Sequence, residues 1–232
     1  MEKPELLDYI LVPMGLALMV GYHIWLLRLI VNHPTKTVIG INTIYRRIWN
    51  GILAVQTLRN NIMASTLLAS TAITLSSIIA VLMTSKTENQ PMMLLYGDKS
   101  QLGLSIKFFS ILLCFFLAFL LNVQSIRYYS HASILINVPV DKKKTKISSH
   151  LTAEYIGKAV NKGSYFWSLG LRAFYFSFPL FLWIFGPIPM FLCCLFLVVM
   201  FYFLDVTFCE LGSAVGVDED GGRAYDVELG SG

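Results

Sequence analysis

Four long apolar runs divide the chain, and polar connections with charged residues separate them. Three of the runs have the length of one membrane-crossing helix, about 20 residues. The fourth extends from Ala173 to Leu204 without a formal charge and is longer than one crossing needs. The pattern predicts an all-α, polytopic integral membrane helical bundle, with three clear transmembrane helices at about 9–31, 62–83 and 104–121.

The fourth run is interrupted by Gly186, Pro187 and Pro189. A continuous helix tolerates such a segment badly, and one straight helix through the whole run would extend beyond the ~30 Å hydrocarbon layer. We therefore expect a hairpin with arms at about 166–185 and 190–208 and a turn from Gly186 to Pro189. One strongly bent helix is the alternative.

The hairpin makes a specific prediction about charge. Arg172 and Asp205 lie at similar distances from the expected turn, and Asp205 is the one acid within the two arms. Because an unpaired charge at membrane depth is costly, we expect the two side chains to pair.

Helical spacing of apolar positions predicts two cytoplasmic amphipathic helices beside the spans. One begins at Asn42 and leads into the second span, and the other covers 149–162 and stops at Gly163. The third apolar run has no helix breaker before Pro139, so its helix is expected to continue past Leu121.

Composition and charge support membrane residence and indicate an orientation. Hydrophobic residues form 56% of the chain and charged residues 14%, whereas soluble domains carry about 25% charged residues. Basic residues concentrate between the first two spans and after the third, which predicts an extracytoplasmic N-terminus. One helical domain is expected over 1–211, and the acidic, glycine-rich segment 212–232 is expected to be a disordered tail. A plasma membrane and an endomembrane fit equally well.

Residue spacings typical of enzymes do not occur in the sequence. There is no His-Glu-x-x-His, no glycine-flanked nucleophilic serine and no phosphate-binding glycine loop. The histidines lack the spacing of metal ligands. We therefore expect no enzymatic activity, no cofactor and no metal.

A short run of lysines follows the third span. It lacks interleaved aromatic residues and lies next to a membrane segment, so anionic lipid headgroups explain it better than nucleic acid does. This candidate lipid-surface loop consists of Lys142, Lys143, Lys144 and Lys146.

Polar side chains from every span are expected near the cytoplasmic membrane face. Arginines outnumber the local carboxylate there, and guanidinium groups suit phosphate or carboxylate oxygens. The group could form a basic vestibule that binds a headgroup or conducts an anion, or it could serve only to orient the chain. The candidate residues are His23, Arg28, Gln56, Arg59, Asn60, Asn61, Asn122, Gln124, Arg127, His131, Arg172 and Asp205.

One face of the second span carries small residues. Close helix packing and a water-lined pore wall would both favour such a stripe. Its members are Asn61, Ser65, Ala69, Ala72, Ser76 and Ala80.

Two stretches, "RRIWNGILAVQTLRNNIMASTLLAS" (46–70) and "LGLRAFYFSFPLFLWIFGP" (169–187), resemble a plant membrane family catalogued as domain of unknown function five-nine-nine. "GYHIWLLRLI" (21–30) resembles the first span of that family. The resemblance implies an integral membrane protein from a plant and supplies no reaction, cofactor or catalytic residue.

Two functions are consistent with these features. The first is an oligomeric channel or small transporter that uses the arginine vestibule, with anions as the candidate substrates. A bundle of this size has little room for a pore of its own, so several copies would be needed. The second is a non-enzymatic structural or scaffolding membrane protein that binds anionic lipid or a protein partner.

Overall fold

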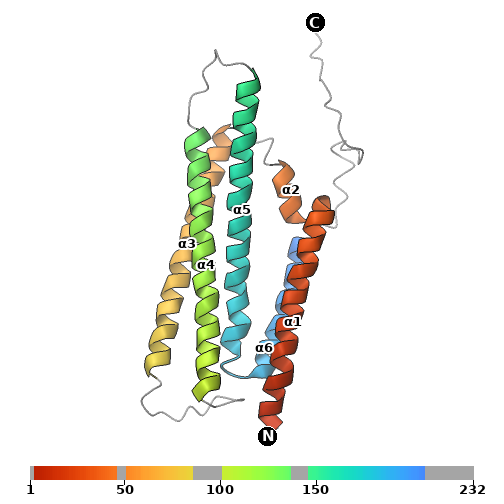
Figure 1. Ribbon diagram of the computed structural model, residues 1–232, viewed down its shortest axis with the longest axis vertical. Coiled ribbons are helices and arrows are strands. Elements are labelled where there is room, and N and C mark those ends of the chain that lie inside the picture. Colours follow the sequence, from red (N-terminus) through yellow and green to blue (C-terminus); the bar gives the residue numbers. More distant parts are fainter. Residues whose placement is uncertain (1–2, 46–50, 86–100, 137–145, 207–232) are drawn as a thin grey trace.

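The structure, a computed structural model, describes residues 3–45, 51–85, 101–136 and 146–206. Within these residues the chain forms long helices that lie alongside one another (Figure 1). The long helices are α1 (Lys3–Asn32), α3 (Gly51–Ser85), α4 (Gln101–Ile136), α5 (Lys146–Leu182) and α6 (Pro187–Asp205). A 3₁₀ turn, η1 (Pro34–Lys36), and the short helix α2 (Val38–Tyr45) follow α1.

The long helices pack mainly in a series, with α3 on α4, α4 on α5, α5 on α6, and α6 on α1. Helices α1 and α6 run in the same direction (Figure 1). An isolated β-bridge between Thr37 and Val206 joins the segments that follow them. The far end of α6 therefore lies beside the end of α1 that is remote from the N-terminus.

Among the described helices, four are long and apolar enough to cross a membrane. Large apolar side chains lie on their outer surfaces; Leu67, Phe196 and Phe203 are each 68% exposed. An extended apolar surface of this kind is stable in lipid rather than in water. The predicted all-helical, multi-pass membrane architecture is confirmed at this level. The four segments are Leu7–Asn32, Ala54–Thr84, Leu102–Ile136 and Pro187–Asp205.

The chain reverses between α5 and α6, so the hairpin is present and the single bent helix is not. Gly186 has φ 154° and ψ 169°, a backbone conformation that essentially only glycine adopts. The expected turn boundaries are wrong, because Pro187 and Pro189 belong to α6 rather than to the turn. Proline suits the first helical positions, where its missing N–H would have no acceptor in any case.

The expected helix end at Gly163 is also wrong, since α5 continues through it from Lys146 to Leu182. Instead, Gly163 lies at a close approach of α5 to α4. A Cβ atom there would lie 2.9 Å from the Tyr129 ring, and the Gly163 carbonyl accepts a hydrogen bond from Ser125 at 2.8 Å. Glycine is needed at this position for close packing rather than for capping.

The other helix boundaries follow local signals. Helix α1 ends at Asn32, close to the end of the predicted 9–31 span, because the residue before Pro34 is disfavoured in a helix. Thr37 caps α2 by accepting a hydrogen bond from the Gly40 N–H at 3.2 Å. The segment 46–50 between α2 and α3 lies outside the described residues, so the amphipathic helix expected from Asn42 stays a prediction.

The small-residue stripe of the second span packs against α4. Ser65, Ala69 and Ala72 are buried, and the Ser65 hydroxyl donates to the Ser125 hydroxyl at 3.5 Å. Since Ser125 in turn donates to Gly163, a chain of hydrogen bonds links α3, α4 and α5. In this single copy, the central part of the stripe serves helix packing.

We expect Gly163→Ala to destabilise the fold, because the new methyl group would overlap the Tyr129 ring, which is itself 1% exposed. Overpacking of this kind costs roughly 1–3 kcal/mol. Gly157→Ala on the same helix is the matched control, since its Cβ would meet nothing within 4 Å. Thermal unfolding in detergent should show a lower Tm for Gly163→Ala only; equal Tm values for the two variants would contradict the close approach.

Candidate functional site

An ion pair at membrane depth joins the two arms of the hairpin. Arg172 lies in the second half of α5, and Asp205 is the last residue of α6. The Arg172 Nη2 donates to the Asp205 Oδ1 at 2.6 Å, and the two side chains are only 15% and 11% exposed. The reversal at Gly186 thus gives Asp205 the partner that the sequence predicts.

Helix α1 contributes a third member to this site. The Tyr22 hydroxyl donates to the Asp205 Oδ2 at 2.9 Å, so both carboxylate oxygens accept a hydrogen bond. Phe201 packs against the group, with its ring stacked on Tyr22 and the Arg172 guanidinium 5.5 Å from its centroid. We call Arg172, Asp205 and Tyr22 the polar cluster.

His23 lies beside the polar cluster without bonding to the carboxylate. Its Nδ1–H donates to the Met19 carbonyl at 2.7 Å, and its ring packs nearly perpendicular to the Phe201 ring. The hydrogen bond to Met19 fixes the tautomer of the neutral imidazole and leaves Nε2 as the acceptor. This arrangement orients the ring as part of the packing around Phe201.

Of the predicted vestibule residues, the structure brings together His23, Arg172 and Asp205. Arg127 lies on the side of α4 opposite Asn122, Ser125 and Tyr129, which form part of its buried stripe. The described residues therefore bring three of the twelve candidates together, and the vestibule as a whole stays a prediction. The residues found exposed are Arg28, Gln56, Arg59, Asn60, Gln124, Arg127 and His131, and Asn61 is half-buried.

Asn122 belongs to the contact between α4 and α5. It is fully buried, and its Nδ2 donates to the Ala118 carbonyl at 2.8 Å. A Cβ atom on Gly170 would lie 2.6 Å from that Nδ2, so glycine at this position lets α5 pass over the amide. Asn122 thus acts in packing, on a different side of α5 from Arg172.

Most of the predicted lipid-surface loop lies outside the described residues. Lys142, Lys143 and Lys144 lie outside the described residues, and Lys146 is the first residue of α5. The predicted tail at 212–232 also lies outside them.

A second charged group, which sequence reasoning missed, lies near the N-terminal end of α1. Lys107 of α4 is 1% exposed, and its Nζ lies 3.9 Å from the Asp8 Oδ2 and 5.3 Å from the centroid of the Trp183 ring. The Trp183 Nε1–H donates to the Asp8 Oδ1 at 3.1 Å. The available signal was a pair of opposite charges at the beginnings of two apolar runs that start from the same face of the membrane.

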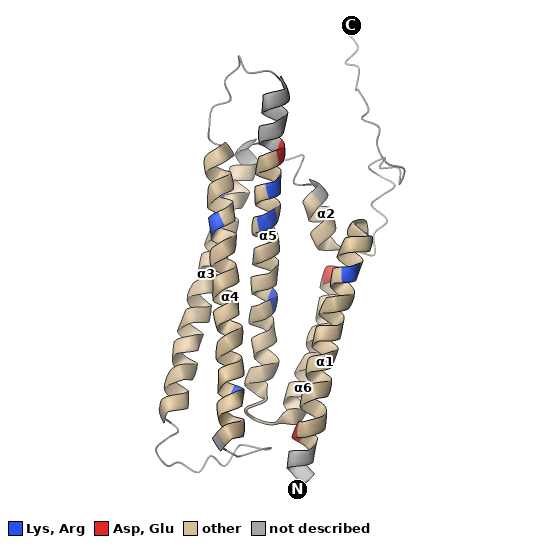
Figure 2. Cartoon of the chain, viewed as in Figure 1, with Lys and Arg blue, Asp and Glu red and all other residues tan. Residues whose placement is uncertain are grey.

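The charges occupy two levels along the helices. Asp8 and Arg28 are 20 positions apart on α1, and Lys107 and Arg127 are 20 positions apart on α4, which is about 30 Å of helix in each case. This rise matches the ~30 Å hydrocarbon thickness of a bilayer. Most Lys and Arg positions lie toward the end of the bundle remote from the N-terminus (Figure 2).

Among the described residues, no group of three or more His, Cys, Asp or Glu side chains could hold a metal ion. The polar cluster contains one carboxylate, and both of its oxygens are occupied by donors from Arg172 and Tyr22. Its geometry holds three helices together at membrane depth.

These features define a class, the multi-pass helical membrane proteins, with an ion pair inside the apolar layer. The family model described as protein of unknown function, DUF599, matches residues 10–209. The chain belongs to this family, in agreement with the resemblance of its sequence. No curated protein and no solved structure matches it.

We expect the polar cluster to be strongly non-additive. Arg172→Gln leaves a buried carboxylate with Tyr22 alone, and Asp205→Asn leaves a buried guanidinium, so each should cost about 3–5 kcal/mol. The double variant removes both charges and should lose less than the sum of the two. Thermal unfolding of all three in detergent tests this, with exposed Arg127→Gln as a control; strictly additive losses would mean that the pair does not form.

Proposed function

We propose that the chain is a non-enzymatic membrane scaffold whose basic end binds anionic lipid headgroups. The observation that carries the proposal is a set of exposed cations on four different helices, none of which takes part in the ion pairs found among the described residues. Its members are Arg28 on α1, Arg59 on α3, Arg127 on α4 and Lys162 on α5. We call these four the basic belt.

The chemistry of the belt suits phosphate at a membrane surface. Long basic side chains keep their stems along apolar surface while their charged heads reach the headgroups. Each cation near an anionic leaflet contributes about 1 kcal/mol of attraction. Lys158 differs from the belt, because its Nζ pairs with Glu154 at 2.8 Å one turn earlier on α5.

The proposal includes an orientation. Lys162 and Leu182 are 20 positions apart on α5, about 30 Å of helix, so α5 has the length to cross the same layer as its neighbours. With α5 added to the four apolar helices, the chain would cross the membrane five times, which puts the N-terminus and the Asp205 end of α6 on opposite sides. The positive-inside rule then puts the basic belt in the cytoplasmic leaflet. The resemblance of the sequence to a plant membrane family also predicts a plant source.

We expect neutralisation of the belt to reduce retention of anionic lipid. Arg28→Gln, Arg59→Gln, Arg127→Gln and Lys162→Gln together should remove several kcal/mol of attraction to phosphatidylglycerol. Protein purified from equimolar phosphatidylglycerol–phosphatidylcholine bilayers, with bound lipid quantified by mass spectrometry, provides the measurement. Single variants can be compared with Lys158→Gln, the ion-paired control. Unchanged phosphatidylglycerol per protein in the fourfold variant would rule out the proposal.

A second candidate is the oligomeric channel or small transporter, and one observation favours it. Arg172 holds a charge at membrane depth, and its Nη1 is buried with no hydrogen-bond partner among the described residues. Charged groups at such depth are typical of ion and substrate pathways. Because Arg28, Arg59 and Arg127 are exposed on three different helices, the vestibule would form between copies of a homo-oligomer.

This candidate predicts anion flux that depends on Arg59. Chloride efflux from proteoliposomes should fall on Arg59→Ala and stay unchanged in the ion-paired control Lys158→Gln. If the proteoliposomes show no chloride efflux, or if efflux is the same in Arg59→Ala, the channel function is ruled out and the scaffold function remains.

A further inference from the structure

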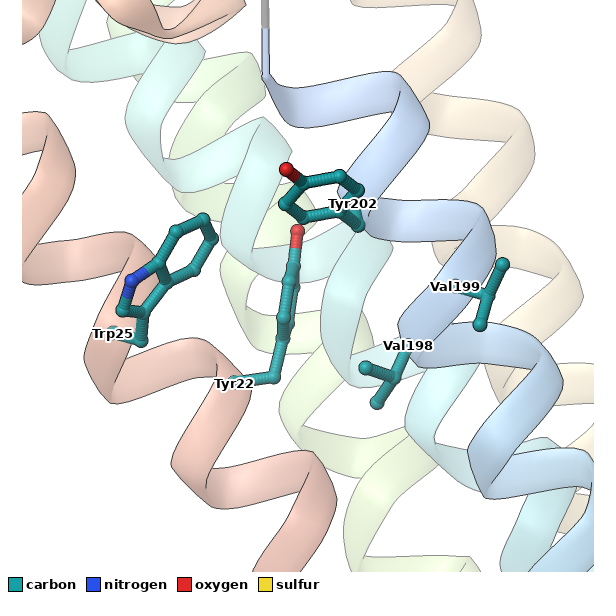
Figure 3. Close-up of a pocket in the computed structure, with 5 residues that line it drawn as sticks. All are labelled: Tyr22, Trp25, Val198, Val199 and Tyr202. Carbon is teal, nitrogen blue, oxygen red and sulfur yellow. The ribbon is translucent and has the colours of Figure 1, made fainter.

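An apolar groove opens on the outer surface between α1 and α6 (Figure 3). Its volume is about 330 Å³. The Trp25 and Tyr202 rings both line it, with their centroids 6.0 Å apart and their planes tilted by 31°. The groove is lined by Tyr22, Trp25, Val198, Val199 and Tyr202.

The groove lies in the half of the apolar layer that faces the basic belt. Tyr22 is 14 positions beyond Asp8 on α1, about 21 Å along the helix, and Trp25 is one turn farther. Arg28 follows Trp25 by three positions, so the two side chains are neighbours on the helix surface. An exposed guanidinium therefore lies about one helical turn beyond the lining residue Trp25, at the expected depth of the headgroups.

We infer that this groove binds one acyl chain of an anionic glycerophospholipid whose phosphate contacts Arg28. The inference rests on the proposed function and assigns it a specific site. The aromatic and valine side chains contact the hydrocarbon, while Arg28 selects for negative charge. Trp25 lies between the two parts, where the amphipathic indole ring is favoured.

A lipid suits the groove better than a second copy of the chain. Two copies that pack through this face in one membrane would be related by an axis along the membrane normal, so equivalent residues would meet at equal depth. Arg28 would then approach Arg28 of the other copy, and like charges repel. A phosphate supplies the opposite charge.

Quenching of Trp25 fluorescence by lipids brominated on the acyl chain tests the inference directly. The chain contains four tryptophans, so subtraction of the signal from Trp25→Phe gives the Trp25 contribution. Both lipids carry a phosphate, but the choline cation cancels its charge in phosphatidylcholine, whereas phosphatidylglycerol keeps a net negative charge. Attraction of that net charge to Arg28 is expected to make brominated phosphatidylglycerol quench at about one fifth of the mole fraction that brominated phosphatidylcholine requires.

Two substitutions should remove the effect for different reasons. Arg28→Gln should abolish the preference for phosphatidylglycerol while both lipids still quench; Arg127→Gln, on the outer side of α4, should leave the preference intact. Val198→Phe should fill the groove and weaken quenching by both lipids, whereas the same change at exposed Val81 of α3 should not. Because Arg28 is exposed, its variant keeps the test decisive even if Val198→Phe fails to fold.

The outcomes separate this inference from the scaffold proposal. Equal quenching by the two lipids in the unaltered chain overturns the groove site. Absence of quenching by either lipid also overturns it, since it would mean that a second copy of the chain covers Trp25. If total phosphatidylglycerol retention still falls when Arg59, Arg127 and Lys162 are neutralised, the scaffold survives that result. If phosphatidylglycerol retention is unchanged when all four belt charges are neutralised, the scaffold function itself is overturned.

Discussion

The structure depends on one constraint, that a charge inside the apolar layer must have a partner of opposite sign. Asp205 ends a helix whose other residues are uncharged, and Arg172 interrupts the apolar half of α5. Each would be costly alone, and together they fix the angle and register of the hairpin. Tyr22 then binds the remaining carboxylate oxygen and attaches α1 to the same point.

The two halves of the bundle are held together by different means. Helices α3, α4 and α5 approach closely through small residues, with Ser65 and Gly163 on either side of Ser125. Helices α1 and α6 are tied to that group by polar contacts at two depths, the polar cluster and the Asp8–Lys107 pair. Helices surrounded by lipid gain little from the hydrophobic effect when they associate. Close packing and polar contacts must therefore stabilise the bundle.

Much of this architecture follows from the sequence, and its limits have physical causes. Apolar run length predicts the long helices, and the cost of an isolated charge predicts the Arg172–Asp205 pair. Local rules failed at Gly163 and Pro187, since glycine and proline each suit two structural roles and only the neighbouring helix decides between them. The outward direction of Arg28 and Arg127 was also unpredictable, because polarity does not reveal which helix face is already covered.

The central claim, that α6 returns to the level at which α1 ends, has a direct test. Thr37 and Val206 form a β-bridge, so cysteines at these two positions lie within reach of a disulfide. In a background with Cys114, Cys193, Cys194 and Cys209 replaced by alanine, mild oxidation of Thr37→Cys/Val206→Cys in membranes should join the two peptides, as mass spectrometry would detect. Persistently free thiols in that variant would place the end of α6 elsewhere and contradict the hairpin.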